Sequence, residues 1–231
     1  MKKNLLAVAV LSSLSLSAFA GGFQAGDMVV RGGLVNVQPD SSEFTIYAGG
    51  EPVDLGLGNL LASVEDDTQV SLNFVYFYDS NWAVEVLAAT PFSHDITVNL
   101  GDGTKTNLGK TKHLPPTVSA LYYFDTNSNF KPYVGAGVNY TFFFDEKFNS
   151  AMEGPDSPLE LSDLKLKNSW GLSAQIGADY YFDDNWSINA SVRYIDIHTK
   201  ARFKALDGAA DGHVNVDIDP MVYSLQVGYK F

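Results

Sequence analysis

The sequence predicts an all-β protein: an eight-stranded antiparallel transmembrane β-barrel with short periplasmic turns and long extracellular loops. The chain ends on an alternating run, Met221–Phe231, in which every second side chain is apolar and most of the others are small or polar. A period of two places the two sets on opposite faces of a strand about ten residues long, which is the unit of an outer-membrane barrel. An export signal and a set of aromatic-flanked turns support the same fold class.

Residues 1–20 have the composition of a cleaved secretory signal peptide. Lys2 and Lys3 form a basic start, an apolar stretch runs from Leu5 to Leu16, and Ala18-Phe19-Ala20 provides a cleavage site. We therefore expect residues 21–231 to form the exported barrel as a single domain. No later stretch approaches the roughly 18 apolar residues that a spanning helix needs, so strands must cross any membrane.

Composition narrows the possible partners. The chain carries a formal net charge of -12, and removal of Lys2 and Lys3 makes the exported part more acidic still, so nucleic acid is a poor partner. There is no cysteine, which excludes disulfides and thiolate metal sites, and we predict no cofactor. The 12 Tyr and 15 Phe residues suit a protein with a large membrane interface.

Three segments repeat one pattern of an aromatic residue, a short Asp/Asn/Ser turn and a second aromatic: Phe77–Trp82, Phe124–Phe130 and Phe182–Trp186. Asp and Asn suit tight hairpins and aromatic rings favour the membrane interface, so these are the predicted periplasmic turns. The predicted extracellular loops are the long polar segments 39–67, 99–112, 145–168 and 206–215, the third with a short helix near Ser157–Leu166. The predicted strands are Asp27–Gln38, Thr68–Tyr78, Trp82–Phe92, Pro116–Phe124, Pro132–Phe144, Ser169–Phe182, Trp186–Ala205 and Val214–Phe231.

Alternation along these strands predicts which side chains line the lumen. Toward the periplasm they are polar or charged and should pair into a plug: Arg31, Glu85, Asp179, Arg193, Gln226 and Lys230. Toward the outside they become apolar: Val35, Val37, Leu87, Ala89, Phe143, Ile195 and Val222. Two readings stay open. In the first, both zones are ordinary core of a narrow barrel. In the second, they form an apolar funnel that is open to the outside and blocked on the periplasmic side, so that a solute must leave laterally into the bilayer.

Prolines suggest where such a release would occur. Proline cannot donate to a strand ladder and belongs at edges, strand ends or bulges. If Gly103 and Thr104 centre the loop between the third and fourth strands, Pro91 lies opposite Pro116, with Pro115 adjacent. Missing hydrogen bonds there would form a lateral portal near the outer surface of the membrane. The alternative is that these prolines only mark where the strands leave the membrane.

Four segments resemble the OmpW family of Gram-negative outer-membrane proteins: Val86–His94, His113–Thr117, Lys131–Asp145 and Leu161–Gly171. The resemblance covers the exported chain and implies an eight-stranded barrel whose narrow hydrophobic tunnel admits small apolar molecules and releases them laterally. It also implies that Leu87 and Trp170 line the tunnel. Simple alternation puts Trp170 on the lipid face, so a bulge would have to turn it inward. Residues 40–67 match the family least and are a candidate for controlling ligand access.

Catalytic and metal sites have weaker support. In the register given above, His94 and His113 face each other, but two histidines and the nearby Asp95 do not complete a metal site. Ser93 and His94 are adjacent in sequence, so on a strand they point to opposite faces, and no nucleophile motif such as G-x-S-x-G occurs. We predict that the protein is not an enzyme.

The sequence thus predicts a passive channel in the outer membrane of a Gram-negative bacterium, with small hydrophobic solutes as its ligands. Outer-membrane lipid and lipopolysaccharide are expected neighbours, and the terminal Phe231 is expected to be read by the barrel-assembly machinery. The alternative is a structural or adhesive barrel that displays acidic loops without transport. That alternative predicts a lumen packed shut at both ends, whereas transport predicts an upper cavity near Leu87.

Overall fold

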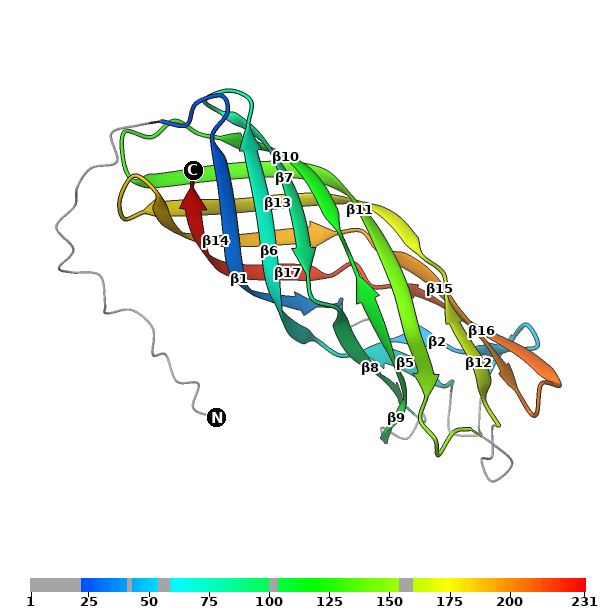
Figure 1. Ribbon diagram of the computed structural model, residues 1–231. Helices are drawn as coiled ribbons and strands as arrows, with labels where there is room; N and C mark the ends of the chain where they lie inside the picture. The colour runs from blue at the N-terminus through cyan, green and yellow to red at the C-terminus, as the bar shows by residue number, and fades with distance from the viewer. Residues whose placement is uncertain (1–21, 41–42, 54–58, 100–103, 154–159) are drawn as a thin grey trace.

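A computed structural model describes residues 22–40, 43–53, 59–99, 104–153 and 160–231; the predicted signal peptide lies outside these residues. Eight antiparallel strands close into a barrel in which each neighbour along the chain is also a neighbour in space, and the last strand pairs with the first (Figure 1). These strands are β1 (Met28–Gln38), β6 (Asp67–Phe77), β7 (Trp82–Ala89), β10 (Thr117–Tyr123), β11 (Phe130–Phe148), β13 (Ser169–Tyr181), β14 (Trp186–Ile195) and β17 (Met221–Lys230). The predicted eight-stranded fold is confirmed.

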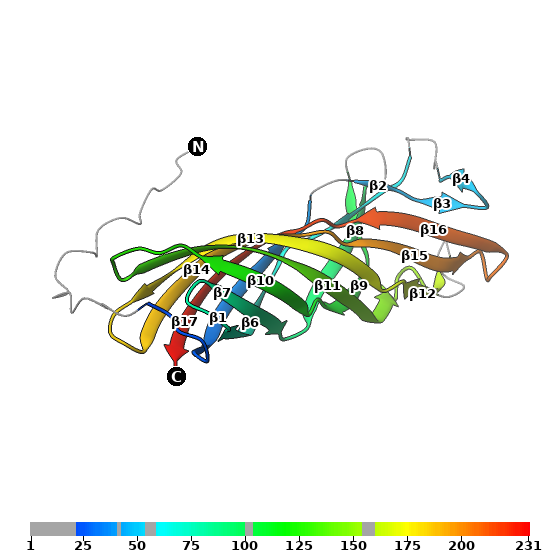
Figure 2. The same ribbon diagram turned by 90° about the horizontal axis from the view of Figure 1, so that it is seen from above.

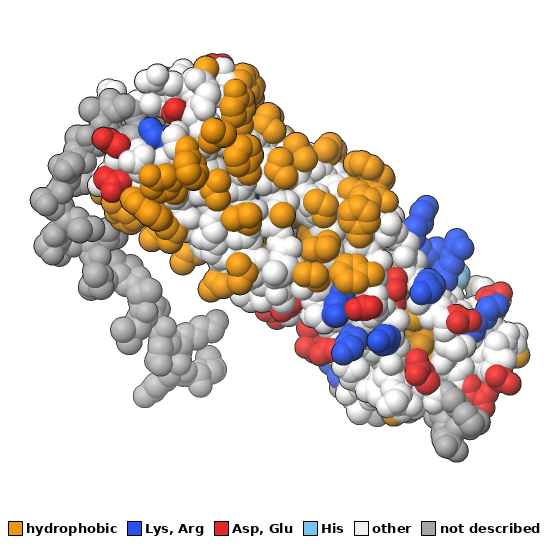
Figure 3. Space-filling model, in the orientation of Figure 1, with side chains coloured by type: hydrophobic (Ala, Val, Ile, Leu, Met, Phe, Trp, Pro, Cys, Tyr) orange, Lys and Arg blue, Asp and Glu red, His pale blue; other side chains and the backbone are white. Residues whose placement is uncertain are grey.

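Side chains on the barrel strands alternate between buried and exposed, and the exposed set is apolar. Leu34, Val70, Leu72 and Leu225 are each more than half exposed. On the face shown in Figure 3, hydrophobic side chains form a belt over the barrel, with Lys, Arg, Asp and Glu gathered mainly beyond it. A belt of this kind is the lipid-facing surface of an outer-membrane barrel. Among the described residues, no helix has the length and apolarity needed to cross a bilayer.

Asp side chains shape two of the predicted tight turns. The Asp79 carboxylate accepts hydrogen bonds from the backbone N–H groups of Asn81 and Trp82, at 2.8 and 2.6 Å. Asp183 accepts the equivalent bonds from the N–H groups of Asn185 and Trp186. These turns lie at the end of the barrel that also holds Phe231 (Figure 1). We call this end the lower end of the barrel, and we call the part of the molecule toward the opposite end the upper half.

The upper half is built of further strands, where the sequence predicts mostly loops (Figure 2). They are β2 (Phe44–Thr45), β3 (Tyr47–Ala48), β4 (Glu51–Pro52), β5 (Leu61–Val64), β8 (Phe92–Asn99), β9 (Lys105–Leu114), β12 (Ser162–Leu166), β15 (His198–Ala205) and β16 (Ala210–Asp217). The helix predicted near Ser157–Leu166 is wrong, because its described second half is β12, which pairs with β15; residues 157–159 lie outside the described residues. Asp163–Leu166 alternates polar and apolar side chains, a strand period that outweighs the helix signal of Pro158.

Three predicted strands are divided in the structure. The strand predicted at Trp82–Phe92 ends at Ala89 and restarts at Phe92, the strand at Trp186–Ala205 divides between Ile195 and His198, and the last divides between Asp217 and Met221. At the first and last divisions a proline supplies no N–H to the ladder. Each division separates a barrel strand from its upper extension.

Candidate functional site

The lowest layer of the barrel interior is an apolar cluster. It consists of buried residues that include Phe23, Phe77, Leu121 and Tyr181. Phe23 precedes the first strand and folds under the barrel, where its ring stacks on Phe77 with centroids 3.9 Å apart. Because these side chains fill the lumen, the lower end is closed by packing.

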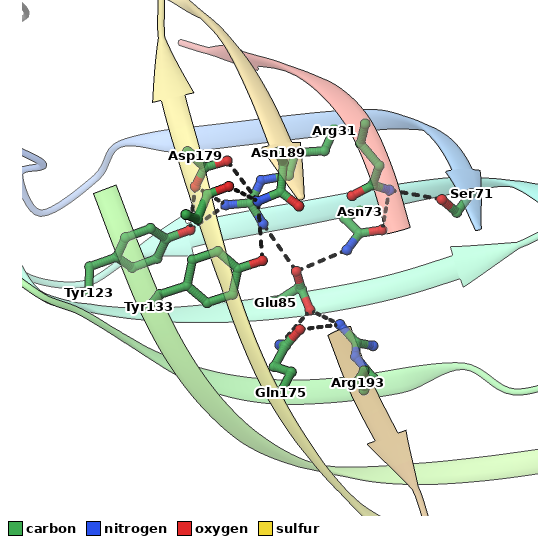
Figure 4. A network of polar contacts seen from close by, with 12 residues as sticks. Arg31, Ser71, Asn73, Glu85, Tyr123, Tyr133, Gln175, Asp179, Asn189 and Arg193 are labelled. Carbon is green, nitrogen blue, oxygen red and sulfur yellow. Dashed lines mark hydrogen bonds and ion pairs between the residues drawn. The ribbon is translucent and has the colours of Figure 1, made fainter. Parts of the chain in front are cut away.

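A buried ionic network lies above this cluster (Figure 4). The Arg31 guanidinium donates to Glu85 at 3.2 Å and to Asp179 at 2.7 Å, and Arg193 pairs with the other carboxylate oxygen of Glu85. All four ionic side chains are at most 4% exposed, and two positive charges balance two negative ones. This is the predicted polar plug, and its members come from four different strands, β1, β7, β13 and β14.

Neutral side chains complete the polar plug. Gln226 donates to Ser71 and Asn73 at 2.8 and 2.9 Å, and Asn73 donates in turn to Glu85 at 2.9 Å. Tyr123, Asn189 and Gln175 supply further hydrogen bonds to the two carboxylates. Lys230 was predicted as a plug member, but it lies at the lower rim, with its Nζ atom 4.0 Å from the Asp27 carboxylate. A last-strand residue beside the terminus is too low to reach the network.

Above the polar plug the lumen becomes apolar, as predicted, and narrows to a small void of about 10 Å³. A volume of this size holds about one water molecule. Six of the predicted tunnel-lining residues surround it, together with two residues that sequence reasoning did not assign to the lining, Phe92 and Pro115. The six are Val35, Val37, Leu87, Ala89, Ile195 and Val222.

An upper cavity of about 460 Å³ opens beyond the void. Its walls come from the strands of the upper half and are almost entirely apolar. The seventh predicted residue, Phe143, lines this cavity and not the void, and other contributors include Ile46, Leu60, Val98, Leu164 and Phe203. Most of these walls belong to residues 39–67, 99–112, 145–168 and 206–215, which the sequence predicts to be loops.

Two histidines form part of the cavity floor. The Nε2 atoms of His94 and His113 lie 2.8 Å apart, and Phe92 stacks on His113 with centroids 5.3 Å apart. The Nδ1 of His94 donates to the Glu65 carbonyl at 2.6 Å, since a carbonyl only accepts. His94 Nε2 therefore accepts the hydrogen of His113. Burial lowers the pKa of both imidazoles, that of His113 to about 3, so the pair is neutral.

The strand ladder is interrupted beside the void. β7 pairs with β10 as far as Leu87 and Thr117, and β8 resumes the pairing with β9 at Phe92 and His113. Between these two pairs, the backbone hydrogen bonds of the described residues run to the strands on either side. The Thr90 N–H donates to the Val70 carbonyl on β6, and the Pro116 carbonyl accepts from the Tyr140 N–H on β11. We call this the ladder break. Pro91 and Pro116 are exposed at it, whereas Pro115 is buried against the void.

The predicted register of these strands is wrong by two residues. His94 pairs with Thr111, not with His113, and Pro91 does not lie opposite Pro116. A β-bulge after Ile96 and a differently centred loop produce the shift. The two imidazoles still meet, because side chains on one face contact diagonal neighbours as well as direct ones.

Trp170 faces outward and is 72% exposed, so the structure corrects its assignment to the tunnel lining. Its ring lies against Tyr140, 4.5 Å between centroids, and the pairing of β11 with β13 is regular through both residues. No bulge turns the side chain inward, and the alternation rule holds at this position.

In the described part of the chain, one group of side chains has the spacing to hold a metal ion, and it does not include His94 or His113. No carboxylate joins His94 and His113 in a three-ligand group; the group that does form is Asp196, His198 and Asp219 in the upper half. Both ring nitrogens of His198 are already paired, with Asp196 at 2.5 Å and Asp217 at 2.7 Å, which raises the pKa of His198. This arrangement fits an imidazolium held between carboxylates.

Comparison with known proteins identifies the family. The model of the OmpW family matches residues 24–231. The chain belongs to the OmpW family. Outer membrane protein W of Vibrio cholerae is 45% identical over all of both chains. The crystal structure of the outer membrane protein OprG from Pseudomonas aeruginosa superimposes with a TM-score of 0.79 at 40% identity, over 91% of this chain and 98% of that one. A more distant relative is the dibenzothiophene metabolism operon protein PahQ of Pseudomonas aeruginosa, 26% identical over 87% of each chain.

This OmpW-family protein is therefore an outer-membrane β-barrel. Barrels of this class have short periplasmic turns and longer extracellular loops. The lower end holds the tight turns, the start of β1 and the end of β17, and it accordingly faces the periplasm. The upper half faces outward. The family and its structural neighbours are outer-membrane barrels and not known enzymes.

Proposed function

We propose that the protein is a passive conduit that takes small hydrophobic molecules through the outer leaflet and releases them sideways into the bilayer. The observation that carries the proposal is the arrangement of three features above the polar plug: a large apolar cavity, a small apolar void, and a ladder break beside that void. No chemical conversion of the solute is involved.

Burial of apolar surface supplies the driving force for entry. A solute that buries about 200 Å² of apolar surface in the upper cavity gains roughly 5 kcal/mol relative to water. That gain offsets the unfavourable passage of an apolar molecule through a charged, carbohydrate-rich layer. The name of the relative PahQ refers to dibenzothiophene, a small apolar aromatic molecule, and a ligand of that class suits the walls of the cavity.

The polar plug and the lower apolar cluster support lateral release. A solute that reaches the void meets Arg31 and Glu85 below it, and an apolar molecule would have to separate their ion pair to continue. Pro115 lines the void and the neighbouring Pro116 is exposed on the outer face of the wall. The shortest exit therefore leads past the ladder break into lipid, which is the predicted portal at Pro91, Pro115 and Pro116.

Insertion of a large side chain at the void tests this route. Ala89 and Ala88 are neighbours on β7; Ala89 lines the void and Ala88 is exposed on the lipid face. Ala89→Trp should reduce uptake of a fluorescent hydrophobic solute into proteoliposomes at least tenfold, and Ala88→Trp should leave uptake unchanged. Equal uptake by the two folded variants would exclude the route. It would favour the alternative of a structural or adhesive barrel, in which the packing at Leu87 is only core.

Two further partners follow from the location. We propose that the C-terminal strand, ending at the exposed Phe231, is recognised by the barrel-assembly machinery, because the ring is 67% exposed at the lower end. Lipopolysaccharide is the proposed neighbour of the upper half. Deletion of Phe231 should slow membrane insertion in cells while a refolded sample keeps its solute uptake.

A further inference from the structure

Within the upper half, lysine and arginine are confined to one part. There is none between residues 32 and 104 and none between residues 206 and 229, although acidic residues are frequent in both stretches. The cations of the upper half lie on β9, the end of β11, β12 with the residue that follows it, and β15. They are Lys105, Lys110, Lys112, Lys147, Lys165, Lys167, Lys200, Arg202 and Lys204.

The arrangement of these cations is unfavourable for the isolated protein. Lys110 on β9 pairs directly with Lys147 on β11, and Lys165 on β12 pairs directly with Arg202 on β15. All four side chains are exposed, and like charges directly opposite each other on a sheet destabilise it. An anion from outside the chain would relieve the repulsion that remains within the two pairs.

Acidic residues of the protein neutralise only part of this charge. Lys112 pairs with Asp145 at 2.9 Å and Lys204 pairs with Asp211 at 2.6 Å. In the described residues, no carboxylate lies within 4.0 Å of the cationic atoms of the two like-charged pairs or of Lys167. These five cations are therefore available to an external ligand.

Their height along the barrel indicates which class of anion they would meet. Phe142 and Trp170, 42% and 72% exposed, mark the upper edge of the hydrophobic belt on this side. Along the chain, Lys167 lies three residues or about 10 Å beyond Trp170, and Lys147 lies five residues or about 17 Å beyond Phe142. Figure 3 shows blue side chains gathered just past the belt. This is the level of lipid headgroups, where cationic side chains meet membrane phosphates.

We propose that Lys110, Lys147, Lys165, Lys167 and Arg202 form a basic surface that binds the phosphates of lipid A, the membrane anchor of lipopolysaccharide. Lys and Arg both bind phosphate, and two separated cation pairs suit a headgroup that carries two phosphates. The exposed rings of Phe142 and Trp170 lie below the basic surface, where they contact the acyl chains. A second copy of the chain is a poorer occupant, because its corresponding surface carries the same charge.

This inference depends on the proposed lipopolysaccharide neighbour but not on the conduit, so the two are tested separately. The test uses the refolded barrel in a non-ionic detergent, with binding of lipid A measured by native mass spectrometry. The ligands compared are bisphosphorylated lipid A, the same lipid without phosphates, and phosphatidylglycerol. The variants are the quadruple change Lys110→Gln, Lys147→Gln, Lys165→Gln and Arg202→Gln, and the matched control Lys105→Gln, which removes a charge at the far end of β9.

The wild-type protein should bind bisphosphorylated lipid A at least tenfold more tightly than either other lipid. The quadruple variant should lose that preference, and Lys105→Gln should keep it. Without lipid, the quadruple variant should be at least as resistant to urea as wild type, because two repulsive pairs are gone. Equal binding of lipid A by wild type and the quadruple variant would overturn the proposal, as would equally tight binding of the phosphate-free lipid or of phosphatidylglycerol.

Discussion

Substitution of Glu85 by Gln tests whether the polar plug is held together by charge. Glu85 is 1% exposed, and its two carboxylate oxygens accept hydrogen bonds from Arg31, Asn73, Gln175 and Arg193. A glutamine keeps the shape but turns an NH₂ group toward a guanidinium and leaves the buried network with one excess positive charge. Removal of one partner from a buried ion pair destabilises a protein by about 3–5 kcal/mol.

The loss is measured as the change in free energy of unfolding, from reversible urea titrations in lipid vesicles followed by tryptophan fluorescence. Glu85→Gln combined with Arg193→Gln restores neutrality and should recover part of the loss. The control is Asp145→Asn, which removes the charge from an exposed pair with Lys112 and should have little effect. If Glu85→Gln destabilises the barrel no more than Asp145→Asn, the plug is not an electrostatic unit.

Three further predictions concern stability, each measured by the same titrations. The unfolded chain protonates His113 near pH 6.5 and the folded one near pH 3, so stability is complete above pH 6.5 and falls on acidification, by about 2 kcal/mol at pH 5; His113→Phe should remove most of this difference. Phe23→Ala should cost about 3–5 kcal/mol by opening the lower cluster, and a loss below 1 kcal/mol would contradict that packing. Gly137→Ala should cost about 1–3 kcal/mol, because a Cβ there lies 2.3 Å from the Val118 carbonyl oxygen, whereas Gly32→Ala has room and should be tolerated.

The barrel and its polar plug were predictable because both follow from strand alternation. A lipid face without charges and a polar inner face fix the parity of every strand, and parity alone places Arg31, Glu85, Asp179 and Arg193 inside. Counting turns then gives eight strands. Lys230 has the right parity but the wrong height, since alternation says nothing about position along the barrel axis.

The upper half was less predictable because its strands do not face lipid. Polar outer faces and apolar inner faces made β9, β12 and β16 resemble loops in part. The register of β8 with β9 depends on a bulge after Ile96 that composition does not reveal. The contact between His94 and His113 was expected for the wrong reason, as a direct pair. Trp170 shows the opposite case, in which alternation was right and the inward role implied by the family resemblance was not.

The most direct test of the conduit maps where a solute travels. A medium-chain alkyl probe that carries a photoreactive diazirine is added outside proteoliposomes, and its covalent adducts are located by mass spectrometry. We expect adducts on cavity residues such as Leu60 and Val98, at Phe92, and at Pro116 of the ladder break, but none on Tyr133 below the plug. In Ala89→Trp the cavity adducts should remain and those at Pro116 should disappear. Adducts at Tyr133, or Pro116 adducts unchanged in Ala89→Trp, would contradict lateral release through the wall.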